Sequence, residues 1–249
     1  MSPLAVAMVT PRFLPFTGGV EVHVREVALR LLARGVTVSV ITTDPTRRLA
    51  ERETVDGIEV RRLRAWPRAT DLHYPRGLAR AIKEAAPDVV HIQGIHTLTA
   101  PLAMVTARRA RLPYAVTFHT GGHPSRVRRS IRPLQWRLLA PLLRRASTLI
   151  AVSRFEASLF RAAIGAGAPE ILVIRNGGVS GTQHQRAAAA VDRTLVLSIG
   201  RLERYKGHHL AIKALVPLRV RIPGARLLVL GSGPYETELR TLARNLGVA

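Results

Sequence analysis

The stretch that decides the fold is LAVAMV (residues 4–9), followed by the loop PRFLPFTGG (residues 11–19) and by VEVHVREVALRLLA (residues 20–33). A short apolar run such as the first one predicts a buried strand. Residues 20–33 repeat apolar side chains at helical spacing, and Gly35 supplies a C-terminal stop. A strand, a glycine-containing loop and a helix in this order are typical of a parallel α/β sheet covered on both faces.

The same alternation of apolar runs and helical patterns continues along the chain. In residues 53–64 an Asp56-Gly57 pair between extended segments predicts a hairpin at the edge of the sheet. The further predicted strands are residues 36–41, 89–92, 114–118, 148–152 and 171–174, and the predicted helices are residues 75–86, 98–109, 127–145 and 154–164. The pattern indicates a Rossmann-like domain.

A second series follows a segment that has no strand pattern. Residues 181–192 are polar and then alanine-rich, which predicts an interdomain linker. We therefore expect an N-terminal Rossmann-like domain at residues 1–180 and the start of a second one at residues 193–249. Two βα units are fewer than a self-standing domain of this type contains, so we expect the second domain to be incomplete. Its predicted strands are residues 195–199 and 226–230, and its predicted helices are residues 207–220 and 235–246.

The composition excludes several classes of protein. Of the 249 residues 47% are apolar, which is ample for a sizeable core and argues against disorder throughout. The chain has no cysteine, so it has no disulfide framework, thiolate-ligated zinc or thiol nucleophile. We expect no secretory signal, because residues 1–10 lack a basic region and run into a glycine-containing loop. We expect no membrane span, because polar residues interrupt the longest uncharged run, residues 89–107. A cytoplasmic setting fits this composition.

The charge is strongly positive and unevenly distributed. Lys and Arg number 38 against 16 Asp and Glu, a formal net charge of +22, and lysine occurs only at Lys83, Lys206 and Lys213. Residues 89–155 contain eleven arginines and no acidic residue. A field of one sign attracts phosphate groups, although an arginine-rich genome explains the total charge equally well.

Two loops that join a strand to a helix are candidate phosphate sites. The Gly18-Gly19 pair lets a ligand approach the backbone at a helix start, but a tight strand-to-helix turn needs the same glycines. In GRLERYKG (residues 200–207), Arg201 offers a bidentate fork and Lys206 a point charge. The alternative for this second loop is a solvated surface segment.

Four histidines lie at or near predicted strand ends: His91, His96, His119 and His123. They lack the HxH and HExxH spacings, so we expect no metal site. His119 lies at the C-terminal end of a predicted strand, which is the edge where open α/β sheets bind ligands, and we expect it to contact one. The alternative is a histidine that merely caps the strand. We expect His208 and His209 to be ordinary surface residues.

Six segments, in order along the chain, together resemble one family of enzymes. They are GGVE (residues 18–21), DVVH (88–91), TFHT (117–120), AVS (151–153), VIRNG (173–177) and GRLE (200–203) with Lys206-Gly207. Over essentially its whole length the chain is similar to the family-four glycosyltransferases of the GT-B fold. The resemblance implies an N-terminal, acceptor-side Rossmann-like domain and a C-terminal domain that binds a nucleotide sugar.

The resemblance also implies a chemistry and roles for single residues. Members transfer a sugar from a nucleotide-sugar donor to an acceptor hydroxyl with retention of configuration, and they need no metal or other cofactor. By similarity, His119 would hydrogen-bond the transferred sugar, and Arg201 and Lys206 would bind the donor diphosphate and stabilise its developing charge. The Gly18-Gly19 pair would contact the donor diphosphate or the edge of the acceptor, and Glu21 would approach the acceptor.

The chain departs from the family pattern in one respect. The family carries a Glu-x7-Glu motif in its C-terminal domain, and residues 193–249 lack it. We therefore expect a truncated transferase with weak or no turnover, the alternative being a non-catalytic sugar- or partner-binding remnant. A sugar-nucleotide epimerase is less favoured because residues 89–155 offer no acid–base carboxylate. Nucleic-acid binding is less favoured because only 4% of the residues are aromatic, so no nucleic-acid partner is expected.

The segment 126–145 bears on the acceptor. It combines arginines with apolar residues at helical spacing, which is typical of an amphipathic helix on an anionic membrane surface. A lipid-linked or phosphorylated acceptor and a peripheral location at the inner face of the membrane would follow. The alternative is a helix that packs within the domain and exposes a solvated basic face.

Overall fold

The computed structural model describes residues 3–66, 74–119, 126–177 and 192–249, with side chains except at residues 126–133. The chain divides into two compact units, Met1–Gly181 (unit 1) and Thr182–Ala249 (unit 2). The linker predicted at residues 181–192 lies, apart from Asp192, outside the described residues.

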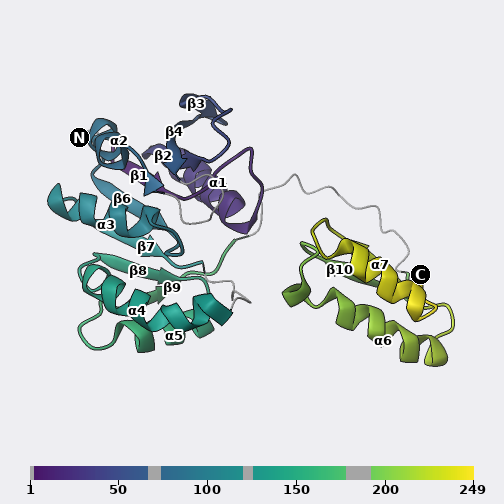
Figure 1. The fold of residues 1–249 in the computed structure, drawn as a ribbon. Coiled ribbons are helices and arrows are strands. Elements are labelled where there is room, and N and C mark those ends of the chain that lie inside the picture. Colours follow the sequence, from purple (N-terminus) through teal and green to yellow (C-terminus); the bar gives the residue numbers. More distant parts are fainter. Residues whose placement is uncertain (1–2, 67–73, 120–125, 178–191) are drawn as a thin grey trace. The chain divides into compact units, whose positions relative to one another are not determined.

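Unit 1 is built on one sheet in the strand order β3-β4-β2-β1-β6-β7-β8-β9, with β5 also paired to β4. Neighbours pair in parallel except β3 and β5, which are each antiparallel to β4. The carboxyl ends of the parallel strands therefore gather at one edge (Figure 1). The strands are β1 (Ala5–Val9), β2 (Thr37–Asp44), β3 (Arg52–Val55), β4 (Ile58–Trp66), β5 (Tyr74–Pro75), β6 (Val89–Gln93), β7 (Tyr114–Thr117), β8 (Thr148–Ala151) and β9 (Ile171–Val173).

Helices cover both faces of this sheet. Val6 and Met8 of β1 pack with Val24 of α1 in one buried cluster, whereas Ala7 and Val9 belong to a second cluster with α2 to α5. Because successive residues of a strand point to opposite faces, α1 covers one face and the other four helices cover the opposite one. The helices are α1 (Gly19–Leu32), α2 (Leu78–Ala85), α3 (Thr99–Arg109), α4 (Arg126–Leu143) and α5 (Arg154–Ile164).

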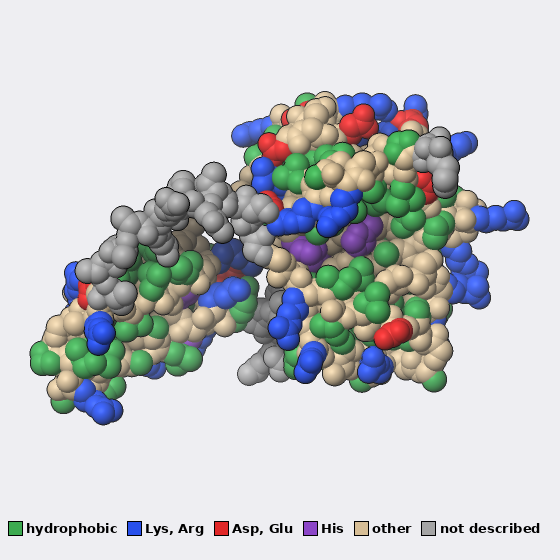
Figure 2. Space-filling model, turned by 180° about the vertical axis from the view of Figure 1, so that it is seen from behind, with side chains coloured by type: hydrophobic (Ala, Val, Ile, Leu, Met, Phe, Trp, Pro, Cys, Tyr) green, Lys and Arg blue, Asp and Glu red, His purple; other side chains and the backbone are tan. Residues whose placement is uncertain are grey.

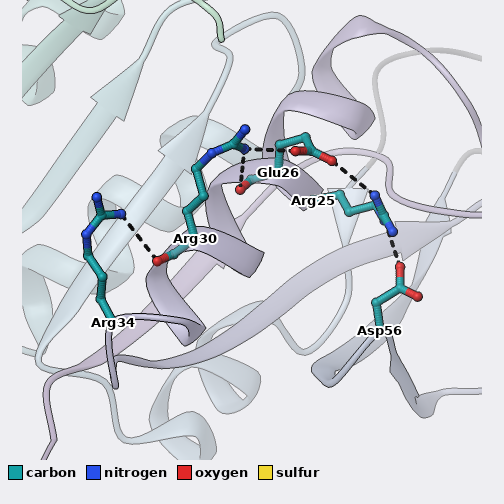
Figure 3. A network of polar contacts seen from close by, with 5 residues as sticks. All are labelled: Arg25, Glu26, Arg30, Arg34 and Asp56. Carbon is teal, nitrogen blue, oxygen red and sulfur yellow. Dashed lines mark hydrogen bonds and ion pairs between the residues drawn. The ribbon is translucent and has the colours of Figure 1, made fainter. Parts of the chain in front are cut away.

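The predicted edge hairpin is present, and its second strand, β4, also pairs with the main sheet, which the sequence did not predict. β3 and β4 join through Asp56 and Gly57, both at positive φ (52° and 80°). β4 then pairs in parallel with β2 and becomes part of the main sheet. Arg25 of α1 donates to Asp56 at 2.7 Å and also contacts Glu26, which pairs with Arg30, so polar contacts link the helix to the turn (Figure 3).

Unit 2 contains two parallel strands, β10 (Leu195–Ile199) and β11 (Arg226–Leu230), with α6 (His208–Arg221) and α7 (Glu236–Asn245). Leu202, Ile212 and Leu239 form its small core. The opposite face of the two strands is exposed by 40–70% at each of its apolar side chains, which are Leu195, Leu197, Ile199, Leu228 and Leu230. Such parallel strands are normally buried on both faces.

The predicted elements agree with the observed ones to within a few residues, but the strand β5 was not predicted. The helix predicted at residues 75–86 begins at Leu78, because Tyr74 and Pro75 form β5 instead. Within the described part of the chain, no helix is long and apolar enough to span a membrane.

Candidate functional site

The loop between β1 and α1 ends at Gly18 and Gly19, where the helix begins. Gly18 is extended (φ −165°) and stands at the N-cap position. A Cβ added to Gly18 would overlap the Glu21 carboxylate, whereas one added to Gly19 would meet nothing within 4 Å. The Glu21 carboxylate therefore lies against the backbone at the helix start. A carboxylate accepts hydrogen bonds and repels phosphate, so this end of α1 suits a hydroxyl group better than a diphosphate.

Side chains from neighbouring strands hold the first half of this loop. The Thr43 hydroxyl donates to the Pro11 carbonyl at 2.6 Å, and the Arg62 guanidinium donates to the Leu14 carbonyl. The Arg62 side chain is only 2% exposed and pairs with Glu53 at 2.5 Å. Sequence reasoning missed Arg62, because an arginine in an edge hairpin is expected to face solvent.

His119 lies just beyond β7 in a cluster of polar side chains. Its Nε2 is 2.8 Å from the Gln93 Oε1, and its carbonyl lies 2.9 Å from the His96 Nε2. The ring of His23, from α1, meets the His119 ring edge-on with centroids 5.0 Å apart. The His91 Nε2 lies 2.8 Å from the Thr117 hydroxyl. Figure 2 shows histidine side chains at the surface of unit 1, beside Lys or Arg side chains.

His91, His119 and His23 are uncharged near neutral pH. Burial, together with the smaller effect of neighbouring histidines, lowers the pKa of His119 to about 3 and that of His91 to about 4. Burial also lowers the pKa of His23. A neutral imidazole exchanges hydrogen bonds with a hydroxyl group but does not neutralise a phosphate.

The Gln93 side chain fixes how His119 can bind a ligand. The Gln93 Oε1 can only accept, so its contact with Nε2 is a hydrogen bond in the tautomer that carries the proton on Nε2 and leaves Nδ1 as an acceptor. Sequence reasoning missed Gln93 and His23, which reach His119 from different elements. His123 lies outside the described residues. Among the residues that are described, no three His, Asp or Glu side chains are grouped so that they could hold a metal ion.

In unit 2, both predicted cations lie on the loop between β10 and α6. The Arg201 side chain is 70% exposed and forms a 3.0 Å ion pair with Glu203. Its Nη2 also lies 3.3 Å from the Tyr205 hydroxyl, and the Lys206 Nζ lies 5.0 Å from the centre of the Tyr205 ring. Tyr205 thus contacts both cations, which sequence reasoning did not anticipate. Two cations on one ordered loop suit a phosphate ligand.

The prediction that His208 is an ordinary surface residue is wrong. Its residue exposure is 2%, its Nδ1 lies 2.9 Å from the Ser198 hydroxyl, and its Nε2 lies 3.2 Å from the Arg201 carbonyl. The histidine is the first residue of α6, directly after the cation loop, and its ring points into unit 2. It therefore connects the end of β10 to the backbone of Arg201.

A second loop, after β11, supports the cation loop from the side. The Leu202 N–H donates to the Ser232 carbonyl and the Tyr235 N–H donates to the Leu202 carbonyl, both at 2.9 Å. A Cβ on Gly231 would overlap the Gly200 carbonyl, and one on Gly233 would overlap the Leu202 backbone. The Gly-Ser-Gly sequence after a predicted strand was the available signal for this close approach.

The predicted site residues are thus divided between the units. Unit 1 carries Gly18, Gly19, Glu21 and His119, and unit 2 carries Arg201 and Lys206. Within unit 1 the structure brings Glu21 against Gly18, and within unit 2 it brings Arg201 and Lys206 to one tyrosine.

Solved structures show the same fold. Sucrose-phosphate synthase from Thermosynechococcus elongatus superposes with a TM-score of 0.71 at 19% identity, over 99% of this chain and 68% of that one. Anabaena HepE, solved with UDP and glucose, gives a TM-score of 0.67 at 19% identity, over 98% of this chain and 67% of that one. The fold is that of the GT-B glycosyltransferases, which confirms the predicted fold class.

Family models then identify the chain more closely. The model described as glycosyl transferase 4-like domain matches residues 18–177, and the model described as glycosyl transferases group 1 matches residues 180–249. The chain belongs to the glycosyl transferase 4-like family, as the sequence resemblance indicated.

Curated relatives are similar at moderate identity. D-inositol 3-phosphate glycosyltransferase of Acidothermus cellulolyticus is 28% identical over all of this chain and 64% of its own length. A GDP-mannose-dependent phosphatidylinositol monomannoside mannosyltransferase of Mycolicibacterium smegmatis is 33% identical over 60% of this chain and 41% of its own length. The chain thus spans less than two thirds of the length of these relatives.

Proposed function

We propose that the chain acts in the transfer of a sugar from a nucleotide-sugar donor to a hydroxyl group of a phosphorylated or lipid-linked acceptor. The observation that carries the proposal is the ordered cation loop, where Arg201 and Lys206 flank Tyr205. Relatives named for GDP-mannose, inositol phosphate and phosphatidylinositol monomannoside support this choice of donor and acceptor.

Each residue has a role in this proposal. Arg201 and Lys206 bind the donor diphosphate and stabilise the negative charge that grows on it as the sugar–oxygen bond breaks. His119 is neutral and exchanges hydrogen bonds with the transferred sugar through Nδ1. Glu21 accepts a hydrogen bond from the acceptor at the Gly18-Gly19 turn.

The transfer itself needs no protein nucleophile. The acceptor hydroxyl attacks the anomeric carbon from the side on which the diphosphate departs, and a phosphate oxygen accepts the hydroxyl proton. The product therefore retains the anomeric configuration. The reaction proceeds without a metal ion, since the two cations supply the positive charge that a metal would otherwise provide.

The test is a transfer assay with UDP-, GDP- and ADP-sugars, using inositol phosphates and polyprenol diphosphate sugars as acceptors. It is carried out on a longer form of the protein that spans the relatives' length, and on this chain for comparison. Arg201→Met and Lys206→Met should each lower turnover by about 100-fold. Arg204→Met, on the same loop, is the matched control and should leave turnover unchanged. NMR of the product should show the retained anomer, and EDTA should have no effect.

The assay also separates the alternative. Donor binding without transfer, both in this chain and in a longer form that spans the relatives' length, would favour a non-catalytic binding protein. Equal loss of donor binding in the Arg204 control and the two test variants would contradict the assignment of the cations.

A further inference from the structure

Two cations and two aromatic side chains share one face of the ribbon formed by β4 and β5. Trp66 lies directly opposite Tyr74 in this antiparallel pair. The Arg76 N–H donates to the Arg64 carbonyl at 3.3 Å, which continues the pairing by one step. Residues two apart on a strand, and residues directly opposite each other, point to the same face. The four side chains, here named the ribbon patch, therefore lie together.

The two faces of the ribbon differ sharply. Ala65 and Pro75, which alternate with the ribbon patch, are buried. On the patch side Trp66 is 64% exposed and Tyr74 is 47% exposed. The ribbon thus turns its large aromatic side chains to solvent and its small side chains inward, the reverse of what a folding core requires.

The cations of the ribbon patch are available to a ligand. Arg64 is 70% exposed, and its ion pair with Glu51 is long, at 3.5 Å, with a partner that is 73% exposed. Such an exposed pair contributes little stability, so a phosphate group can replace the carboxylate. Arg76 is also exposed. Tyr and Trp combine an apolar ring with a polar group and prefer the boundary between headgroups and acyl chains.

The ribbon patch lies at the functional edge of the sheet. β4 runs parallel to β2, so Trp66 lies at the same edge as the ends of β1 and β7. β4 and β1 are two strands apart, which corresponds to about 10 Å. The loop that carries Gly18 and Gly19 follows β1 directly. A surface that contacts the ribbon patch would therefore reach the candidate acceptor site.

We propose that the ribbon patch docks unit 1 onto an anionic membrane, with Trp66 and Tyr74 in the headgroup boundary and Arg64 and Arg76 on lipid phosphates. The inference rests on the proposed function, because docking at this edge would bring the site to a lipid-linked acceptor. It assigns the membrane contact to β4 and β5 rather than to the basic helix α4.

The chain offers a direct probe, because it contains only two tryptophans, Trp66 and Trp136. Trp136 packs edge-on against Phe160, so Trp136→Phe keeps an aromatic ring there and leaves Trp66 as the only tryptophan, which is excited selectively at long wavelength. Titrated with phosphatidylglycerol vesicles, this variant should show a blue shift of its emission and quenching by brominated acyl chains. Phosphatidylcholine vesicles should cause neither change. If Trp136→Phe fails to fold, fluorine NMR of the wild-type chain labelled with 5-fluorotryptophan should report the same response at the Trp66 signal.

Variants assign the contact to a surface. Arg64→Gln with Arg76→Gln should lower the affinity for anionic vesicles, measured by sedimentation, by about 30-fold. Trp66→Ser with Tyr74→Ser should abolish it. The matched control is Leu138→Ser on α4, since Leu138 is 68% exposed, and it should bind as the wild type does.

Four results would overturn the docking proposal. The first is loss of binding in Leu138→Ser with full binding in the ribbon variants, and the second is no binding of the wild-type chain to anionic vesicles. The third is unchanged Trp66 emission on binding. The fourth is a Trp66 response to single-stranded oligonucleotides instead of vesicles. The two proposals fail separately. Vesicle docking without sugar transfer by the longer form that spans the relatives' length would contradict the proposed function. Transfer to a lipid-linked acceptor by the Trp66→Ser, Tyr74→Ser variant of that form at the wild-type rate would contradict the docking.

Discussion

The buried ring of His208 joins the Ser198 hydroxyl at 2.9 Å to the Arg201 carbonyl at 3.2 Å. The Arg201 guanidinium thus extends into solvent, while the His208 ring holds the Arg201 backbone in place. A preorganised cation loses less entropy when it binds a phosphate than one on a free loop.

Removing this ring should loosen the cation loop. His208→Ala leaves the Ser198 hydroxyl and the Arg201 carbonyl without their partner, which should lower the free energy of unfolding by about 1–3 kcal/mol. Hydrogen exchange should accelerate at Leu202 and its neighbours. His209→Ala is the control, since the His209 ring packs edge-on against Tyr235 and makes no bond to the loop. Equal effects of the two variants would show that His208 has no special role.

The close approach of the two loops in unit 2 requires Gly231. In Gly231→Ala the new methyl group would overlap the Gly200 carbonyl, which should cost about 2–3 kcal/mol of stability. Gly224→Ala is the control, because its methyl group would meet Thr194 at an ordinary 3.7 Å. Urea unfolding monitored by circular dichroism compares the two. If the Gly231→Ala variant were as stable as the control, the loops after β10 and β11 could move apart without a loss in the free energy of unfolding.

Acid should destabilise unit 1 through its histidines. These groups titrate near pH 6.5 when unfolded, whereas burial holds the pKa of His119 at about 3 and that of His91 at about 4 in the folded unit. The unfolded chain therefore binds more protons below pH 6.5, so stability is complete above that pH and falls as the pH drops toward 4. We expect a loss on the order of 3 kcal/mol between pH 7.5 and pH 5, measured by urea unfolding.

A variant checks the origin of this loss. His91→Gln with His119→Gln removes the two groups whose pKa values are lowered most, so its stability should depend much less on pH over the same range. An unchanged pH dependence would assign the loss to other groups.

Gly18→Ala should separate binding from stability. The backbone of Gly18 is extended, so alanine fits it without strain, and the change in stability should stay within about 0.5 kcal/mol. The methyl group should displace the Glu21 carboxylate and weaken acceptor binding as much as Glu21→Gln does. Gly19→Ala, whose methyl group would meet nothing within 4 Å, is the control. Normal acceptor affinity in Gly18→Ala would exclude Glu21 from the site.

The strands of unit 1 were predictable because each is a short apolar run with turn residues on both sides. β4 shows where this approach stops: its first half forms the hairpin that Asp56-Gly57 predicts, but its parallel pairing with β2 depends on a partner distant in the sequence. The same holds for β5, whose two residues carry no strand pattern of their own.

The candidate site divides in the same way. Arg201 and Lys206 stand out because they are charges on a strand-to-helix loop, and local sequence suffices to find them. His208 looked like a surface residue because its helical pattern is weak, and Arg62 because arginine is seldom buried. Each side chain is held by a contact with a backbone carbonyl: His208 contacts that of Arg201, and Arg62 contacts that of Leu14. Sequence patterns hold no record of such contacts.

The bare apolar face of β10 and β11 has a practical consequence for the measurements above. Environment-sensitive dyes such as ANS fluoresce on exposed apolar surface, and five aliphatic side chains of unit 2 supply such a surface in this chain. A dye-based melting scan of this chain would start at high signal and show little further rise. Thermal stability is therefore best followed by circular dichroism, at low protein concentration and without kosmotropic salts, which favour the burial of this face between molecules.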